Sequence, residues 1–72
     1  AATQIFIEAP YRNQALLDTL LHTCEPDTLL CLATDITLPG ESILTRKVAG
    51  WRKAPPDINR RPTVFLLYRG TN

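Results

Sequence analysis

The sequence predicts one small α/β domain with a mixed sheet of about four strands, in the order β-α-β-β-(short α)-β. Two nearly continuous apolar runs, at residues 29–36 and 63–68, are typical of buried strands. An amphipathic stretch lies between residues 11 and 24, and Pro39-Gly40 marks a tight turn. Because a chain of 72 residues hides only roughly 60% of its unfolded surface, we expect no more than one domain.

The first strand is expected at about residues 3–8, where Ile5, Phe6 and Ile7 form an apolar run. Pro10 then suits the first turn of a helix, since its missing N–H would be unpaired there in any case. This strand-to-helix corner, with charged Glu8 and Arg12, is where α/β enzymes often place functional groups.

The helix over residues 11–24 has an apolar face and a polar face, and Pro26 follows its end. The apolar face is expected to contain Leu16, Leu17, Leu20, Leu21 and Cys24, and the polar face Asn13, Gln14, Asp18 and Thr19.

Residues 42–48 alternate between apolar and polar side chains, which predicts a half-exposed strand after the Pro39-Gly40 turn. Residues 48–53, with Trp51, are expected to form a helical turn that Pro55-Pro56 ends. A right-handed β-α-β crossover makes the first two strands a parallel pair, whereas a short turn makes the next strand antiparallel. The sheet should therefore be mixed.

The composition, 44% hydrophobic and 21% charged, is that of an ordinary globular protein. No apolar run approaches the roughly 20 residues of a membrane helix, and no signal peptide is visible. We expect a cytoplasmic protein without a membrane partner. The chain has no methionine and its first strand begins almost at once, so we expect it to be part of a larger protein.

Charge is distributed unevenly along the chain. Residues 1–45 contain six acidic residues and one basic residue, and residues 46–72 contain seven basic residues and one acidic residue. A basic region can bind an anionic partner such as RNA. The favoured interpretation is a solvated rim that pairs with the acids of the first half, because charge runs are weak evidence for a partner. Aromatic residues are too sparse for base stacking, which argues against a stand-alone nucleic-acid module.

Cys24 and Cys31 match no zinc or redox spacing, and we interpret them as small apolar residues in a reduced cytosol. The single histidine, His22, supplies no further metal ligand, and its position favours a polar or capping role near the helix C-terminus. No metal site is expected.

Several catalytic motifs are missing from the sequence. Glycines occur only at positions 40, 50 and 70, so no dinucleotide fingerprint or phosphate loop is present, and Ser42 lacks a nucleophile elbow. Glu8, Asp35 and Glu41 lie near expected strand ends, which leaves a paired-carboxylate hydrolase conceivable. The simpler hypothesis, that each caps a loop or pairs with an arginine, is favoured. The catalytic residue is unknown.

Two strings and a glutamate show a resemblance to a known family. They are Thr3-Gln4-Ile5-Phe6-Ile7-Glu8-Ala9-Pro10-Tyr11-Arg12, then Leu30-Cys31-Leu32-Ala33-Thr34-Asp35-Ile36-Thr37, and Glu41. This arrangement resembles the C-terminal domain of the tetrapyrrole methylases, the class III S-adenosylmethionine methyltransferases. Within that family it is most similar to the branch of the 16S ribosomal RNA 2′-O-cytidine methyltransferase. The resemblance spans nearly all of residues 1–72.

The resemblance implies a two-domain methyltransferase whose N-terminal domain is absent from this chain. S-adenosylmethionine would bind in the cleft between the domains, mainly through backbone groups at strand ends of this domain. The positions to which these contacts carry over are Glu8, Ala9, Cys31, Leu32, Pro62 and Thr63. A homodimer is implied, with ribosomal RNA or a tetrapyrrole as the methyl acceptor, and the domain alone would be inactive.

The alternative is an autonomous interaction domain that binds RNA or protein. For RNA, the basic residues expected to make the contacts are Arg46, Lys47, Arg52, Arg60 and Arg61. Such a domain would bind RNA on its own, and salt would weaken the binding.

Overall fold

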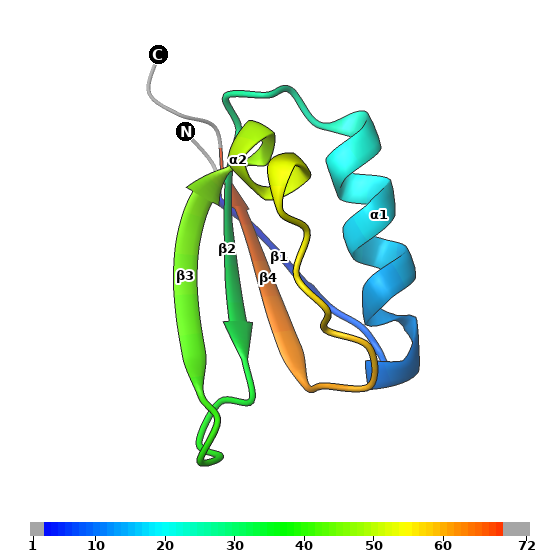
Figure 1. The fold of residues 1–72 in the computed structure, drawn as a ribbon, viewed down its shortest axis with the longest axis vertical. Helices are drawn as coiled ribbons and strands as arrows, with labels where there is room; N and C mark the ends of the chain where they lie inside the picture. Colours follow the sequence, from blue (N-terminus) through cyan, green and yellow to red (C-terminus); the bar gives the residue numbers. More distant parts are fainter. Residues whose placement is uncertain (1–2, 69–72) are drawn as a thin grey trace.

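The computed structural model describes residues 3–68, and its element order is the one predicted from the sequence (Figure 1). Strand β1 (Thr3–Ile7) leads through the 3-10 turn η1 (Pro10–Arg12) into helix α1 (Asn13–Thr23). Strands β2 (Leu29–Thr34) and β3 (Ser42–Lys47) form a hairpin, and helix α2 (Val48–Lys53) and strand β4 (Thr63–Tyr68) follow.

The boundaries follow from local chemistry. Pro10 opens η1 after Ala9 in an extended conformation, so the first turn of the expected helix is 3-10 rather than α. Helix α1 ends before Cys24, which is extended two residues ahead of Pro26. Strand β2 ends two residues earlier than expected because Asp35 has a φ of 55°, which no strand residue adopts.

The sheet has the order β1-β4-β2-β3, and every neighbouring pair is antiparallel. The expectation of a mixed sheet, with the first two strands as a parallel pair, is therefore wrong. Strands β1 and β2 do run in the same direction, but β4 lies between them and separates them. Strand β4 suits this interior position because both of its faces are apolar, with Phe65 and Leu67 on one side and Val64 and Leu66 on the other.

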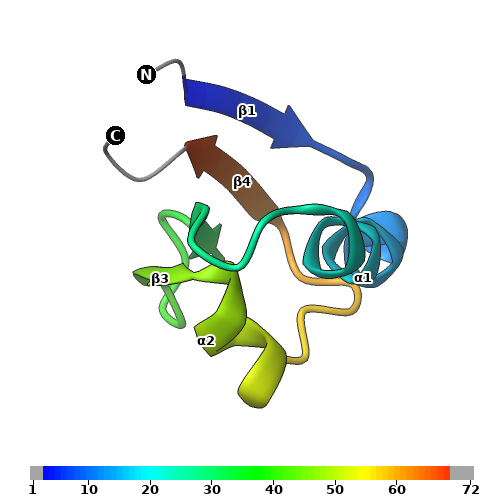
Figure 2. The ribbon, with the colours of Figure 1, turned by 90° about the horizontal axis from the view of Figure 1, so that it is seen from above.

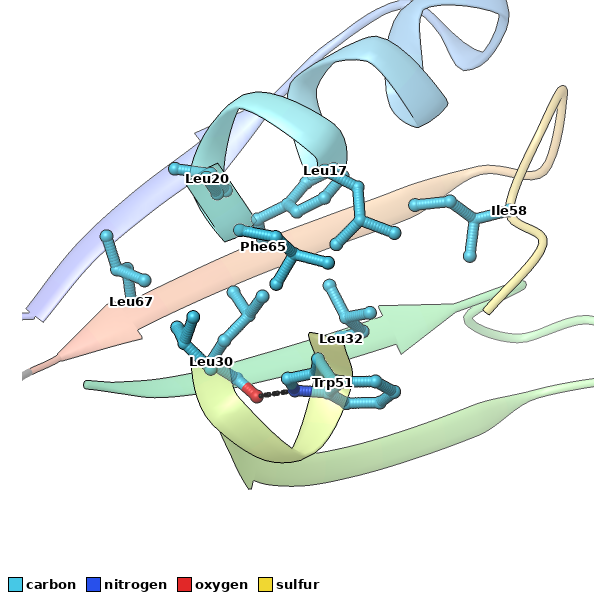
Figure 3. Close-up of a cluster of buried hydrophobic side chains, with 10 residues drawn as sticks. Leu17, Leu20, Leu30, Leu32, Trp51, Ile58, Phe65 and Leu67 are labelled. Carbon is cyan, nitrogen blue, oxygen red and sulfur yellow. Dashed lines mark hydrogen bonds between the residues drawn. The ribbon is translucent and has the colours of Figure 1, made fainter. Parts of the chain in front are cut away.

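Both helices cover the same face of the sheet, as the view from above shows (Figure 2). The core between these helices and the sheet contains Leu17, Leu20, Leu21, Leu30, Leu32, Val48, Trp51, Ile58, Phe65 and Leu67 (Figure 3). The predicted apolar face of α1 is confirmed, with Leu16 and Cys24 packed at its margin. Neither helix of the described residues is long and apolar enough to cross a membrane.

Within residues 3–68, no helix covers the opposite face of the sheet (Figure 2). The strand pairing places Ile5, Ile7 and Ile43 on this face, where they are 61%, 73% and 58% exposed. We call this surface the open face.

Candidate functional site

At one end of the sheet, at the bottom of Figure 1, strands β1 and β2 end and strand β4 begins. Backbone hydrogen bonds fix the chain at this end of the sheet. The N–H of Arg12 donates to the Ala9 oxygen at 2.8 Å, which closes the corner after β1. The N–H of Arg60 donates to the Pro10 oxygen at 3.1 Å, which joins that corner to the loop before β4. Two segments far apart in sequence thus meet here.

A hollow of about 250 Å³ opens at this end of the sheet. Ile7, Glu8 and Pro10 line it from the corner, Ile36 lines it from the loop after β2, and residues 62–64 line it from the start of β4. Most of these residues are apolar, and Glu8, a half-buried acidic residue, is the one charged residue among them. Such a surface suits a ligand with a flat apolar part and a polar or cationic part.

The structure brings part of the predicted cofactor site together at this hollow. Glu8, Pro62 and Thr63 line it, and Ala9 is an exposed residue of the corner between two lining residues. Cys31 and Leu32 do not reach it.

Those two residues lie in the interior of β2, which is paired on both sides. Cys31 is opposite Thr45 and Leu66, and Leu32 is opposite Leu44 and Phe65. Because a central strand uses its backbone N–H and C=O groups in the two ladders, Cys31 and Leu32 have none to offer a ligand. Ile36, which was not among the predicted site residues, lines the hollow from this part of the chain.

The loops around the hollow hold backbone strain. Three non-glycine residues among the described ones have positive φ angles: Asp35 at 55°, Thr37 at 68° and Arg60 at 63°. The left-handed region is costly for such residues, most of all for a β-branched one such as Thr37. All three lie in the two loops that border the hollow, and strain of this kind concentrates where a function requires a fixed loop shape.

An ion pair joins the two loops. The Nη2 and Nε atoms of Arg61 both donate to Oδ2 of Asp35, at 2.6 and 3.0 Å. The pKa of Arg61 is raised, first by this hydrogen bond and then by the charge of Asp35. The N–H of Asp35 also donates to the Pro62 oxygen at 2.7 Å, so both the side chain and the backbone of Asp35 bind the segment before β4. A side chain at Gly40 would crowd this pair, because a Cβ there would lie 3.2 Å from Oδ2.

Asn13 fixes the loop before β4 from the other side. Its side chain is fully buried, and its Nδ2 donates to the Arg61 oxygen at 2.5 Å. The Thr63 hydroxyl donates to the same oxygen at 2.9 Å. Oδ1 of Asn13 has no hydrogen-bond partner among the described residues. The sequence placed Asn13 on the polar face of the helix. Only its position near the start of the helix, where asparagine often bonds to backbone groups, could have indicated this contact.

The three carboxylates singled out from the sequence have separate roles. Asp35 pairs with Arg61, and the Glu41 carboxyl group accepts the Thr37 N–H at 2.7 Å across the loop. The simpler hypothesis is thereby confirmed for these two. Glu8 alone faces the hollow, so no pair of free carboxylates is brought together there.

Several of the basic residues proposed for RNA binding make contacts within the described chain. Lys47 Nζ lies 3.6 Å from Asp27 Oδ1. Nε and Nη2 of Arg52 donate to the oxygens of Leu21 and Cys24, at 2.5 and 2.8 Å, and so cap the C-terminus of α1.

The guanidinium group of Arg46 lies 5.1 Å from the ring centre of Trp51, a cation–π distance. Arg60 lies in the loop before β4, where its N–H donates to the Pro10 oxygen, and Arg69 lies outside the described residues. Four of the five basic residues proposed for RNA binding, counting Arg61, therefore have a side-chain contact within the described residues.

Cys24 and Cys31 are free thiols, as the sequence predicted; Cys24 is partly buried and Cys31 is buried. The predicted role of His22 is confirmed too, since its Nδ1 lies 2.8 Å from the Asp18 oxygen in the last turns of α1. Among residues 3–68, no three of the side chains that bind metals cluster together.

Neither a scan against protein-family models nor a search of curated proteins finds a match to this chain.

Proposed function

We propose that this chain forms one wall of the S-adenosylmethionine cleft in a methyltransferase of the tetrapyrrole methylase family. One observation supports this most: the first string of the resemblance and the end of the second meet at a single hollow. The first contributes Ile7, Glu8 and Pro10, and the second contributes Ile36. Segments that resemble those of one family and that converge on one surface make that surface the best candidate for the cofactor.

The lining of the hollow fits part of the cofactor. Ile7, Pro10 and Ile36 offer apolar surface for a flat base, and the Glu8 carboxylate offers a negative charge to a sulfonium or to ribose hydroxyls. A hollow of about 250 Å³ that is open on one side can enclose only a portion of such a molecule. The other wall would come from the protein's own N-terminal domain.

S-adenosylmethionine supplies a methyl group on an already activated sulfonium, so positioning and exclusion of water can provide much of the catalysis. The residues of this chain would hold the cofactor rather than move protons. Ribosomal RNA and a tetrapyrrole are the two candidate methyl acceptors, the intact enzyme would act in the cytoplasm, and we expect a homodimer.

The test uses the intact protein, in which an N-terminal domain precedes this chain. Ile36→Trp would fill the hollow, whereas Leu38→Trp changes a comparably exposed residue of the same loop that does not line it. We expect calorimetry to show S-adenosylmethionine binding that Ile36→Trp weakens at least tenfold and Leu38→Trp leaves within twofold. An intact protein with no affinity for the cofactor would refute the proposal. Equal effects of the two variants would place the cofactor elsewhere.

One observation also supports the alternative of an autonomous interaction domain: Ile5, Ile7 and Ile43 are 61%, 73% and 58% exposed on the open face. This observation supports a protein partner rather than RNA.

A further inference from the structure

The loop after β2 places Ile36 in the wall of the hollow, between two residues with strained backbones. Ile36 lines the hollow and is 41% exposed. Its neighbours Asp35 and Thr37 have φ angles of 55° and 68°, both in the left-handed region. Aspartate visits this region more readily than most residues do, so the β-branched Thr37 carries more of the strain. The loop keeps this shape only while other contacts hold it.

Two kinds of contact hold the loop, and one of them crosses to a distant part of the chain. Within the loop, the Thr37 N–H donates to the Glu41 carboxyl group at 2.7 Å. Across to the segment before β4, the Asp35 N–H donates to the Pro62 oxygen at 2.7 Å, and the Asp35 carboxyl group accepts two bonds from Arg61. Only the second kind fixes Ile36 relative to the start of β4, which supplies the facing part of the wall.

Arg61 is itself held firmly from the core side. Its backbone oxygen accepts one bond from Asn13 Nδ2 at 2.5 Å and another from the Thr63 hydroxyl at 2.9 Å. Its N–H donates to the Ile58 oxygen at 3.1 Å. Asn13, Ile58 and Thr63 are all buried. When the ion pair breaks, the strained loop is therefore the part that moves.

Burial makes the Asp35 carboxyl group depend on Arg61. The Asp35 side chain is only 15% exposed, and within residues 3–68 both hydrogen bonds to its carboxyl group come from Arg61. A carboxylate that is nearly buried and loses its cation is destabilised until it reaches water. We propose that the Asp35–Arg61 ion pair is a latch, which keeps Ile36 in the wall of the hollow against the strain at Thr37. Without the latch, Thr37 relaxes to a negative φ and Ile36 leaves the wall.

Hydrogen exchange tests the latch whether or not a cofactor binds. Mass spectrometry follows exchange of the backbone amides of residues 35–41 in the intact protein, and circular dichroism checks that each variant is folded. We expect Arg61→Gln and Asp35→Asn to speed this exchange at least tenfold, because the loop opens once the ion pair is broken. The control is Lys47→Gln, which breaks a different ion pair, with Asp27, and should change the exchange less than twofold.

Calorimetry measures what the latch does for S-adenosylmethionine, and this part rests on the proposed function. We expect Asp35→Asn to weaken cofactor binding at least fivefold and Lys47→Gln to leave it within twofold. Addition of Thr37→Gly to Asp35→Asn should restore both the exchange and the affinity to within threefold of the wild type. Glycine adopts a positive φ without strain, so the loop no longer has to be held. A direct contact between Asp35 and the cofactor would not be rescued in this way.

Unchanged exchange in Arg61→Gln and Asp35→Asn would overturn the latch, and so would a double variant that exchanges as fast as Asp35→Asn. Faster exchange in Asp35→Asn with undiminished cofactor affinity would also overturn the inference, because the position of Ile36 would then not matter to the ligand. A wild-type protein without affinity for the cofactor refutes the proposed function alone. In that case, rescue of the exchange by Thr37→Gly would still support the latch.

Discussion

The indole Nε1 of Trp51 donates a hydrogen bond of 2.8 Å to the backbone oxygen of Leu30, which joins the short helix α2 to the central strand β2 (Figure 3). Both residues belong to the core, so water cannot replace this bond. A helix of six residues has little stability of its own. Its place over the sheet therefore depends on this side chain.

Trp51→Phe keeps an aromatic ring but removes the donor and part of the volume. We expect a loss of about 1–3 kcal/mol in the free energy of unfolding. Urea titration followed by circular dichroism measures this loss. The control is Arg46→Met, which removes only the cation above the ring and should cost less than about 1 kcal/mol. A larger loss for Arg46→Met than for Trp51→Phe would contradict the role of the buried hydrogen bond.

Thr37→Gly should stabilise the chain. Thr37 has a φ of 68°, which strains a β-branched residue and not glycine. Relief of that strain exceeds the entropy that glycine adds to the unfolded state, so we expect a gain of about 0.5–1 kcal/mol in the same urea titration. The bond from the residue 37 N–H to Glu41 is kept. Thr45→Gly, in extended strand β3, is the control and should destabilise. A loss at both positions would show that the φ of Thr37 stores no strain.

Asp35 and Arg61 should behave as a coupled pair. Arg61→Gln and Asp35→Asn each break the ion pair, so we expect the double variant to be scarcely less stable than either single variant. The wild-type advantage over either variant should shrink in 1 M NaCl, because the Arg61 side chain is 46% exposed and salt screens exposed charges. Additive losses in the double-mutant cycle would mean that the residues act independently.

The sequence predicted the elements well and their pairing less well. Amphipathic periodicity located Leu17, Leu20 and Leu21, and the Pro39-Gly40 turn located the β2–β3 hairpin, because both signals are local. The position of β4 between β1 and β2 is not local, since apolar residues show that a strand is buried and not which strands lie beside it.

The same distinction explains the candidate site. Glu8 was singled out because a proline marks its corner. Cys31 and Leu32 were assigned to strand-end contacts by the family resemblance, but both lie inside β2, which ends at Thr34. Ile58 is a core residue that composition does not predict, because it lies in a Pro-rich loop and is nevertheless only 2% exposed. No periodicity marks a single apolar residue in a loop.

Asn13 provides a prediction that depends on pH. Its Nδ2 donates to the Arg61 oxygen within a fully buried environment. Asn13→Ala removes this donor but also the unpartnered Oδ1, so we expect a loss of only about 1–2 kcal/mol. Asn13→Asp places a carboxyl group against the Arg61 oxygen, and burial will raise the pKa of that group above its value of about 3.9 in the unfolded chain.

A group whose pKa is raised by folding binds more protons in the folded state, so its contribution to stability falls as the pH rises through the folded pKa. Below about pH 4 the new carboxyl group is protonated in both states and can donate to the Arg61 oxygen as the amide does. We therefore expect Asn13→Asp to approach the wild-type stability near pH 4 and to lose much more than Asn13→Ala at pH 7. Urea titrations of the three proteins at both pH values measure this difference. A loss for Asn13→Asp that is independent of pH would show that water reaches the side chain and that it does not hold the loop from within the core.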